Sequence, residues 1–249
     1  RPRLLTFLLA GIMSLSFIPA ESAAALGLKV APLQYKAVLK ENEVQQGFID
    51  VSNPSTQAVS VRTSVQAFRQ IDDDGGLQFY DEGLVQAGIK PELETFELGP
   101  RQALRMYFSI DGRTLPEGDA YAAIFFTTEP TQPRNGVGQL VRVGTLLSIV
   151  NRTPGSRKAE VTAISLPLLQ LSGTVEGTYG IKNTGPKDTG FYPTVRVSSW
   201  PGGKPRDIEG SLVFGGRERT NDFKYDTGLG IHLVEIGYGA SKKSQWVIV

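Results

Sequence analysis

The sequence contains no cysteine, which excludes disulfide bonds and thiolate metal sites. It contains one histidine, His232, so a mechanism that needs two imidazole groups is excluded as well. Neither sign of charge dominates, because 26 lysine and arginine residues stand against 25 aspartate and glutamate residues. A protein held on nucleic acid by phosphate contacts needs a strongly basic face, and this near-neutral balance argues against a nucleic-acid partner.

Amphipathic helical patterns of useful length are missing after residue 25, and strand-like alternation is present in their place. Residues 59–68 and 103–110 alternate apolar and polar side chains, which is the period of a half-buried strand. Glycine and proline, 28 and 15 residues respectively, separate such segments with turn signals. The sequence therefore predicts an all-β protein.

Three local patterns predict how the strands connect. Residues 103–110 and 121–127 are separated by about ten mostly polar or turn-forming residues, and we expect them to form an antiparallel pair. Pro32 interrupts the extended segment 28–38, which is predicted to be an edge strand or one that switches between sheets at the proline. The run DDDGG at 72–76 is predicted to close a hairpin into residues 77–80. Its alternative, a calcium site, lacks the EF-hand spacing.

The chain divides into three parts. Residues 1–25 combine a positive start, an apolar run and small residues, and are predicted to be a secretory signal peptide, with an uncleaved anchor as the alternative. Residues 26–151 hold about seven strand segments with the turn spacing of a β-sandwich. The segment NRTPGS at 151–156 is the predicted boundary, and residues 156–249 form a second small β domain.

Three motifs in the first domain resemble the N-terminal immunoglobulin-like domain of PapD-like periplasmic chaperones. They are VSNPS at 51–55, FELGPRQALRM at 96–106 and LPEGDAY at 115–121. A similar order of motifs occurs in Gram-positive surface proteins that bind peptidoglycan and accompany WxL proteins. The resemblance implies two immunoglobulin-like β-sandwiches in tandem, the second by analogy alone.

The strand at 140–150 is the predicted partner-binding element, because a free sheet edge can accept a strand from another protein. In the family resembled, the last strand of the first domain does this work. One face of this strand is unusually apolar for a solvent-facing surface. The residues predicted to bind a partner are Leu140, Arg142, Leu146 and Val150. The alternative is a strand buried on both sides against the second domain.

Basic residues near this strand are a second candidate site. Family chaperones bind a pilin's terminal carboxylate with an arginine in the first strand and a lysine near the last strand of the first domain. Gln34 aligns with that arginine, and Lys36 replaces it if the register slips by two residues. The second basic residue would be Arg142 or Arg152, so Lys36 and Arg152 are the predicted anchor.

The sequence predicts an exported, non-enzymatic protein-binding module of the periplasm or cell surface. Neither a G-x-S-x-G nor an S-x-x-K arrangement is present, and we predict no cofactor and no metal. The first hypothesis is a PapD-like chaperone or assembly factor with an extracytoplasmic protein client. The alternative is a cell-surface adhesion or peptidoglycan-binding protein whose partner is a surface polymer, contacted through residues 81–95 and the second domain.

Overall fold

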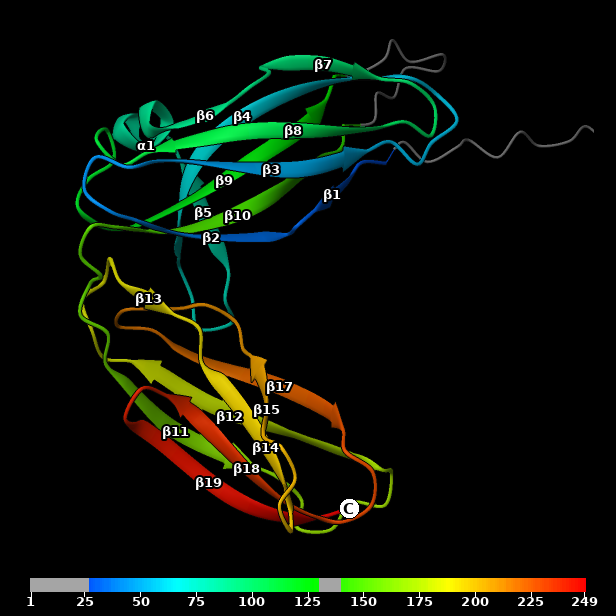
Figure 1. The fold of residues 1–249 in the computed structure, drawn as a ribbon, viewed down its shortest axis with the longest axis vertical. Helices are drawn as coiled ribbons and strands as arrows, with labels where there is room; N and C mark the ends of the chain where they lie inside the picture. Colours follow the sequence, from blue (N-terminus) through cyan, green and yellow to red (C-terminus); the bar gives the residue numbers. More distant parts are fainter. Residues whose placement is uncertain (1–26, 130–139) are drawn as a thin grey trace, which may run out of the picture.

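The computed structural model describes residues 27–129 and 140–249 and shows an all-β protein built of two β-sandwiches in tandem (Figure 1). The predicted signal peptide, residues 1–25, lies outside the described residues. One helix occurs within the described ranges, α1 (Gly83–Gly88). No helix in these ranges is long and apolar enough to cross a membrane.

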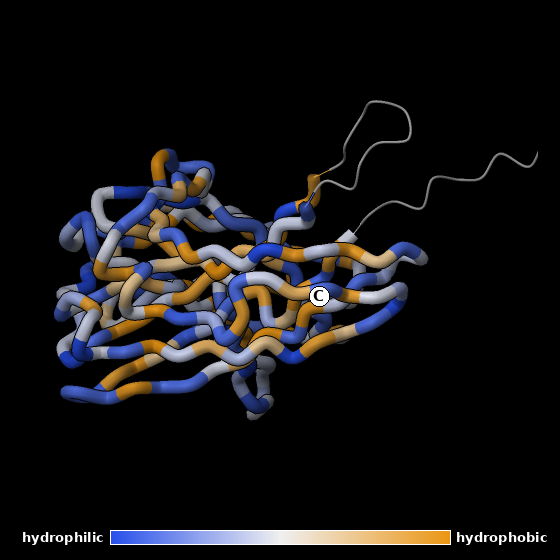
Figure 2. The backbone as a smooth tube through the Cα atoms, turned by 90° about the horizontal axis from the view of Figure 1, so that it is seen from above, coloured by the Kyte–Doolittle hydropathy of each residue, from blue (hydrophilic) through white to orange (hydrophobic). Residues whose placement is uncertain are grey.

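The first sandwich consists of two facing sheets. One has the strand order β1-β3-β8-β6, and the other has the order β2-β10-β9-β4-β5, with β7 beside β4. The bounds are β1 (Lys29–Ala31), β2 (Gln34–Leu39), β3 (Val44–Ser52), β4 (Val59–Gln70), β5 (Leu77–Tyr80), β6 (Ile89–Pro91), β7 (Thr95–Leu98), β8 (Ala103–Asp111), β9 (Gly118–Thr128) and β10 (Arg142–Asn151). Figure 2 shows hydrophobic and hydrophilic residues alternating along much of the chain, as expected when one face of each strand packs on the core.

The chain changes sheets at Pro32, as one of the two predicted alternatives states. β1 pairs antiparallel with β3 in one sheet, and β2 pairs parallel with β10 in the other. Proline has no N–H group to donate to a ladder, so its position between the two short strands interrupts neither of them.

The expected pairing of residues 103–110 with residues 121–127 is wrong. β8 pairs with β3 and β6, whereas β9 pairs with β10 and β4 in the opposite sheet. Met106 and Phe108 enter the core from one side, and Ile124 and Phe126 enter it from the other. The segment between β8 and β9 therefore crosses the sandwich, because both strands carry a face that has to be covered.

The motifs at 51–55 and 96–106 meet at one buried side chain. Asn53 is buried, and its Nδ2 donates hydrogen bonds to the carbonyl oxygens of Gln57, Leu98 and Gly99. A buried amide group needs such partners, because leaving it unpaired costs about 1–3 kcal/mol. Asn53 thus fixes the turn after β3 against the turn after β7.

The second sandwich comprises nine strands in three sheets, ordered β11-β12-β17, β15-β14-β18-β19 and β13-β16. The bounds are β11 (Ala159–Ser165), β12 (Thr174–Asn183), β13 (Gly190–Phe191), β14 (Thr194–Trp200), β15 (Arg206–Glu209), β16 (Val213–Phe214), β17 (Glu218–Asp226), β18 (Ile231–Tyr238) and β19 (Ser241–Ile248). Its core includes Val175, Tyr179, Val234 and Val247. The predicted boundary at 151–156 lies between β10 and β11, and no strand pairing among the described residues joins the two sides.

Candidate functional site

β10 is the strand predicted to be a free edge, and that prediction is wrong for most of its length. β2 pairs with it in parallel from Leu146, opposite Gln34, to Asn151, opposite Leu39. On its other side β10 pairs with β9 along its whole length. Leu146 and Val150 therefore lie in a strand that is paired on both sides, because the chain brings β2 alongside after the switch at Pro32.

An open backbone edge remains at the start of β10. The N–H group of Leu146 donates to the carbonyl of Leu33 over 2.9 Å, and backbone groups that face one side alternate along a strand. The N–H and C=O groups of Arg142 and Gly144 therefore face the same side, beyond the start of β2. Within the residues that the structure describes, they have no backbone partner there.

β2 is the outermost strand of this sheet, so it forms the rest of the edge. Leu33 accepts from Leu146 of β10, and Leu39 accepts from Arg152, which directly follows β10. The alternation turns the backbone groups of Gln34, Lys36 and Val38 outward. We call the outward backbone of residues 34–38 and 142–144 the stepped rim. Leu33 and Leu140 flank the step between the two strands, with 67% and 59% of their surfaces exposed.

The side chains of Arg142 and Leu146 face the outer side of the sheet, where side chains of both sandwiches gather. The Arg142 guanidinium lies 3.7 Å from the centre of the Phe125 ring and donates to Gln66 over 2.6 Å. Leu146 packs against a cluster that contains Phe125 of the first sandwich and Phe214 of the second. For Leu146 the structure thus supports the alternative of a strand covered on both faces.

That cluster is an aromatic contact between the two sandwiches, and we call it the aromatic junction. Its buried members are Phe68, Tyr121, Ala123, Phe125 and Phe214. Phe214 of β16 lies 4.4 Å from the Tyr121 ring and 6.0 Å from the Phe68 ring, measured between ring centres. Its backbone N–H donates to the Gln70 side chain at the end of β4.

The hairpin of β4 and β5 reaches toward the second sandwich in Figure 1. The predicted hairpin is confirmed, since Gln70 pairs with Leu77. At its tip Asp72 accepts from the N–H of Gly76, and Asp73 accepts from the N–H of Glu218 over 3.2 Å. The acidic run therefore serves as a turn and a contact with β17. No group of three His, Cys, Asp or Glu side chains in the described ranges is arranged to hold a metal ion.

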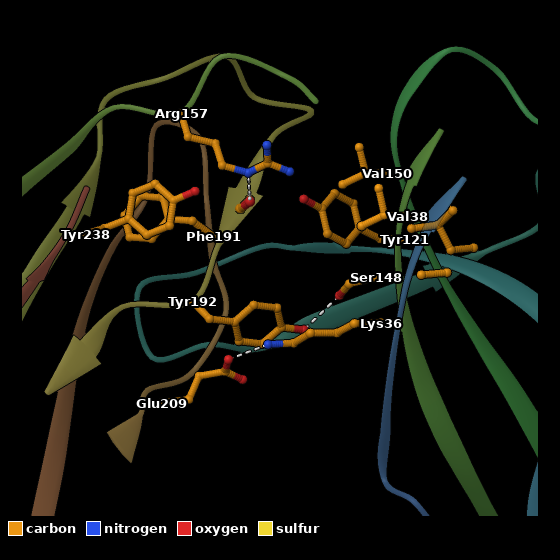
Figure 3. A pocket seen from close by; sticks show the side chains of 13 residues that line it. Lys36, Val38, Tyr121, Ser148, Val150, Arg157, Phe191, Tyr192, Glu209 and Tyr238 are labelled. Atoms are coloured by element: carbon orange, nitrogen blue, oxygen red, sulfur yellow. Dashed lines mark hydrogen bonds and ion pairs between the residues drawn. The ribbon is translucent and has the colours of Figure 1, made fainter. Parts of the chain in front are cut away.

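A cavity of about 280 Å³ between the sandwiches contains Lys36, one of the two predicted basic anchors (Figure 3). Lys36 pairs with Glu209, and its Nζ lies 3.7 Å from the centre of the Tyr192 ring. The Tyr192 hydroxyl contacts the Ser148 hydroxyl at 2.7 Å. Burial raises the pKa of Tyr192. Val150 also lines the cavity.

Arg152, the other predicted anchor, does not line this cavity. Its backbone N–H donates to the carbonyl of Leu39, at the far end of β2. Lys36 lies opposite Ser148, whereas Arg152 follows the end of β10, four residues farther along the chain. The structure does not bring the two basic residues together.

A buried ion pair between Asp119 and Arg157, close to the aromatic junction, was not predicted from the sequence. Arg157 donates to both carboxylate oxygens of Asp119 over 2.7 and 2.9 Å, and it also donates to the carbonyl of Gly190. The Asp119 side chain is 1% exposed and the Arg157 side chain is 15% exposed. Burial, together with the Asp119 charge, raises the pKa of the neighbouring Tyr121. No local motif marks this pair, because its members are 38 residues apart in the sequence.

Comparison with known proteins gives matches in structure only. No family model and no curated protein matches the sequence. A solved structure of the class 5 fimbriae chaperone CfaA is 9% identical, with 90% of this chain and 100% of that chain covered and a TM-score of 0.45. A chain of the CsuC–CsuE chaperone–tip adhesion subunit complex from Acinetobacter baumannii is 11% identical, with 89% and 98% covered and a TM-score of 0.43. A chain of the Salmonella enterica SafA pilin–SafB chaperone complex is 14% identical, with 90% and 96% covered and a TM-score of 0.41.

Proposed function

We propose that this chain is an exported, non-enzymatic module that binds an extended segment of an extracytoplasmic protein at the stepped rim. The observation that carries this function is the open backbone of Arg142 and Gly144, next to an outermost strand whose own outward groups are free of backbone partners in the described ranges. A sheet edge of this kind pairs with an added strand through main-chain hydrogen bonds. This is the chaperone or assembly-factor role predicted from the sequence.

The site differs from the one predicted from the sequence in the residues that would contact the partner. Leu146 is withdrawn into the aromatic junction, and β2 covers the second half of β10. The backbone at Arg142, together with the exposed side chains of Leu33 and Leu140, takes their place. Apolar side chains beside free main-chain groups are the combination that strand addition uses for specificity and affinity.

Replacing Arg142 by proline tests the backbone role directly. Proline removes the N–H group, and it is tolerated at Arg142 because this is the first residue of β10. We expect Arg142→Pro to weaken binding of short extended peptides about fivefold, since one main-chain hydrogen bond is worth about 1 kcal/mol. Fluorescence anisotropy with a panel of peptides that alternate valine and threonine measures this change.

Arg142→Ala is the matched control, because it removes the same side chain contacts to Phe125 and Gln66 but keeps the N–H group. It is expected to bind the peptides within about twofold of the unmodified chain. Equal losses in the two variants would show that the side chain, not the rim, holds the peptide. Retention of the chain on purified peptidoglycan, with no peptide binding, would favour the cell-wall alternative instead.

Lys36 is proposed to bind the carboxylate at the end of the partner segment, since its Nζ lines the cavity beside β2. Its pairing with Glu209 is solvent-exposed and therefore weak, so a second carboxylate can compete for the ammonium group. We expect a peptide with a free C-terminus to bind about fivefold more tightly than its C-terminal amide. In Lys36→Met this preference should vanish, whereas Arg152→Met should keep it. If Lys36→Met retains the preference, Lys36 is not the anchor.

A further inference from the structure

The only two tryptophans in the sequence lie on the second sandwich, and both are exposed. Trp200 ends β14 and has 62% of its surface accessible, and Trp246 on β19 has 48% accessible. Single apolar residues on a protein surface are common and need no explanation. Two exposed tryptophans on one sheet can form a contiguous apolar patch, and such a patch does need an explanation.

Strand register places these side chains in one patch. Trp200 lies opposite Ile231, Ile231 lies opposite Ile248, and Leu233 lies opposite Trp246. Residues that face each other across neighbouring strands share one face of the sheet. Leu169 forms a further parallel bridge with Ile248. We call this patch the tryptophan face, and its members are Leu169, Trp200, Ile231, Leu233, Trp246 and Ile248.

The tryptophan face lies on the outer side of the sheet formed by β14, β18 and β19, which are side by side in Figure 1. On the opposite face of these strands, Val197, Val234 and Val247 are buried in the core of the second sandwich. His232 is buried on that face as well, with its Nδ1 3.0 Å from the Ser199 hydroxyl. Apart from this polar pair, the strands are apolar on both faces here. Strands with two apolar faces are typical of a sheet that is covered on both faces.

Polar residues border the tryptophan face on the same side of the sheet. Farther along the strands, Arg196 pairs with Asp207 over 2.7 Å, and Lys242 pairs with Glu235 over 2.9 Å. An apolar centre with a polar rim is the usual composition of a protein–protein interface. Because the rim charges neutralise each other in pairs, they do not select a charged partner.

The arrangement of the apolar side chains is self-complementary. The tryptophans lie on either side of β18, whose Ile231 and Leu233 lie between them, and Ile248 lies two residues from Trp246 on β19. A copy related by a two-fold axis can place each tryptophan over the aliphatic residues of the other copy, which is the requirement for an isologous contact. The six side chains present on the order of 500 Å² in each copy, so two copies bury about 1,000 Å², the lower limit of a specific interface.

We propose that the tryptophan face docks on the same face of a second copy of this chain and forms a weak symmetric homodimer. No residue of the tryptophan face belongs to the stepped rim. The dimer therefore goes beyond the proposed binding of an extended partner, and each can fail without the other.

Tryptophan fluorescence and sedimentation equilibrium of the full chain test the dimer together. Since every tryptophan belongs to the tryptophan face, a blue shift of the emission with rising concentration reports burial of this face. We expect a dissociation constant of about 1–100 μM, with the shift and the increase in mass following the same curve. Ile231→Glu places a charge at the centre of the face and should weaken dimerisation at least about a hundredfold.

Tyr107→Glu is the matched control, because Tyr107 is a large residue on β8 of the first sandwich that is 50% exposed, against 39% for Ile231. It should leave the dimer within about twofold, and the far-ultraviolet circular dichroism of both variants should match that of the unmodified chain. A monomer at about 1 mM, or a dimer that Ile231→Glu leaves unchanged, would overturn the proposal. So would a monomer whose tryptophan emission shifts only when another protein with an apolar sheet face is added.

Discussion

Replacing Asp119 by alanine is expected to lower the free energy of unfolding by about 3–5 kcal/mol. The substitution leaves the Arg157 guanidinium largely buried with no carboxylate, and removing one member of a buried pair costs the desolvation of the other. It also removes an acceptor for the Tyr121 hydroxyl, 3.4 Å away, and for the Gly155 backbone N–H. Chemical denaturation followed by circular dichroism measures the loss.

Asp50→Ala is the control for this substitution. Asp50 also makes two hydrogen bonds to an arginine, Arg105, but both side chains are about half exposed. An exposed pair contributes little to stability because water and salt screen it, so this variant should unfold almost as the unmodified chain does. A double variant, Asp119→Leu with Arg157→Met, is expected to recover part of the loss, because no charge is then left buried. Equal losses for Asp119→Ala and Asp50→Ala would contradict the importance assigned to burial.

Local alternation explains why the strands could be predicted from the sequence. Residues 77–80 were predicted with the bounds that the structure has, because a turn signal at 72–76 precedes them and apolar residues recur at every second position. The missing N–H group of Pro32 predicted either an edge strand or a switch between sheets, and the structure has the switch. These features depend on residues that are neighbours in the chain.

Strand pairing and the contacts between the sandwiches could not be predicted in this way. β17 carries charged or polar residues at most positions, so alternation of apolar residues predicts no strand there, yet it pairs along its whole length with β12. β2 and β10 are separated by about a hundred residues, and nothing local indicates that one covers the other. The free rim was therefore assigned to the wrong part of β10.

The outer face of β10 illustrates the same limit. Its apolar residues were correctly recognised as unusual for a solvated face, but the sequence does not reveal what covers each of them. Leu146 meets the aromatic junction, Val150 lines the cavity beside Lys36, and Leu140 stays exposed. One apolar stripe thus has three environments, because the second sandwich and the β4–β5 hairpin cover only part of it.

Removing the aromatic ring of Phe214 is expected to uncouple the two sandwiches. Phe214 is buried, and its ring packs on Tyr121 and Phe68 of the first sandwich. Phe214→Ala should lower the free energy of unfolding by about 3–5 kcal/mol through lost burial and the cavity that remains. Since the loss falls on the contact between the sandwiches, differential scanning calorimetry should change from one cooperative transition to two.

Phe223→Ala separates this effect from general destabilisation. Phe223 is also buried, but it packs in the core of the second sandwich against Tyr179, with 6.2 Å between ring centres. It should lower stability by a similar amount, about 3–5 kcal/mol, while the transition stays single because the aromatic junction is intact. Two transitions in both variants, or in neither, would mean that Phe214 does not couple the sandwiches. The proposed binding at β2 requires the two sandwiches to stay fixed to each other, because Glu209 and Tyr192 of the second sandwich position the Lys36 side chain of β2.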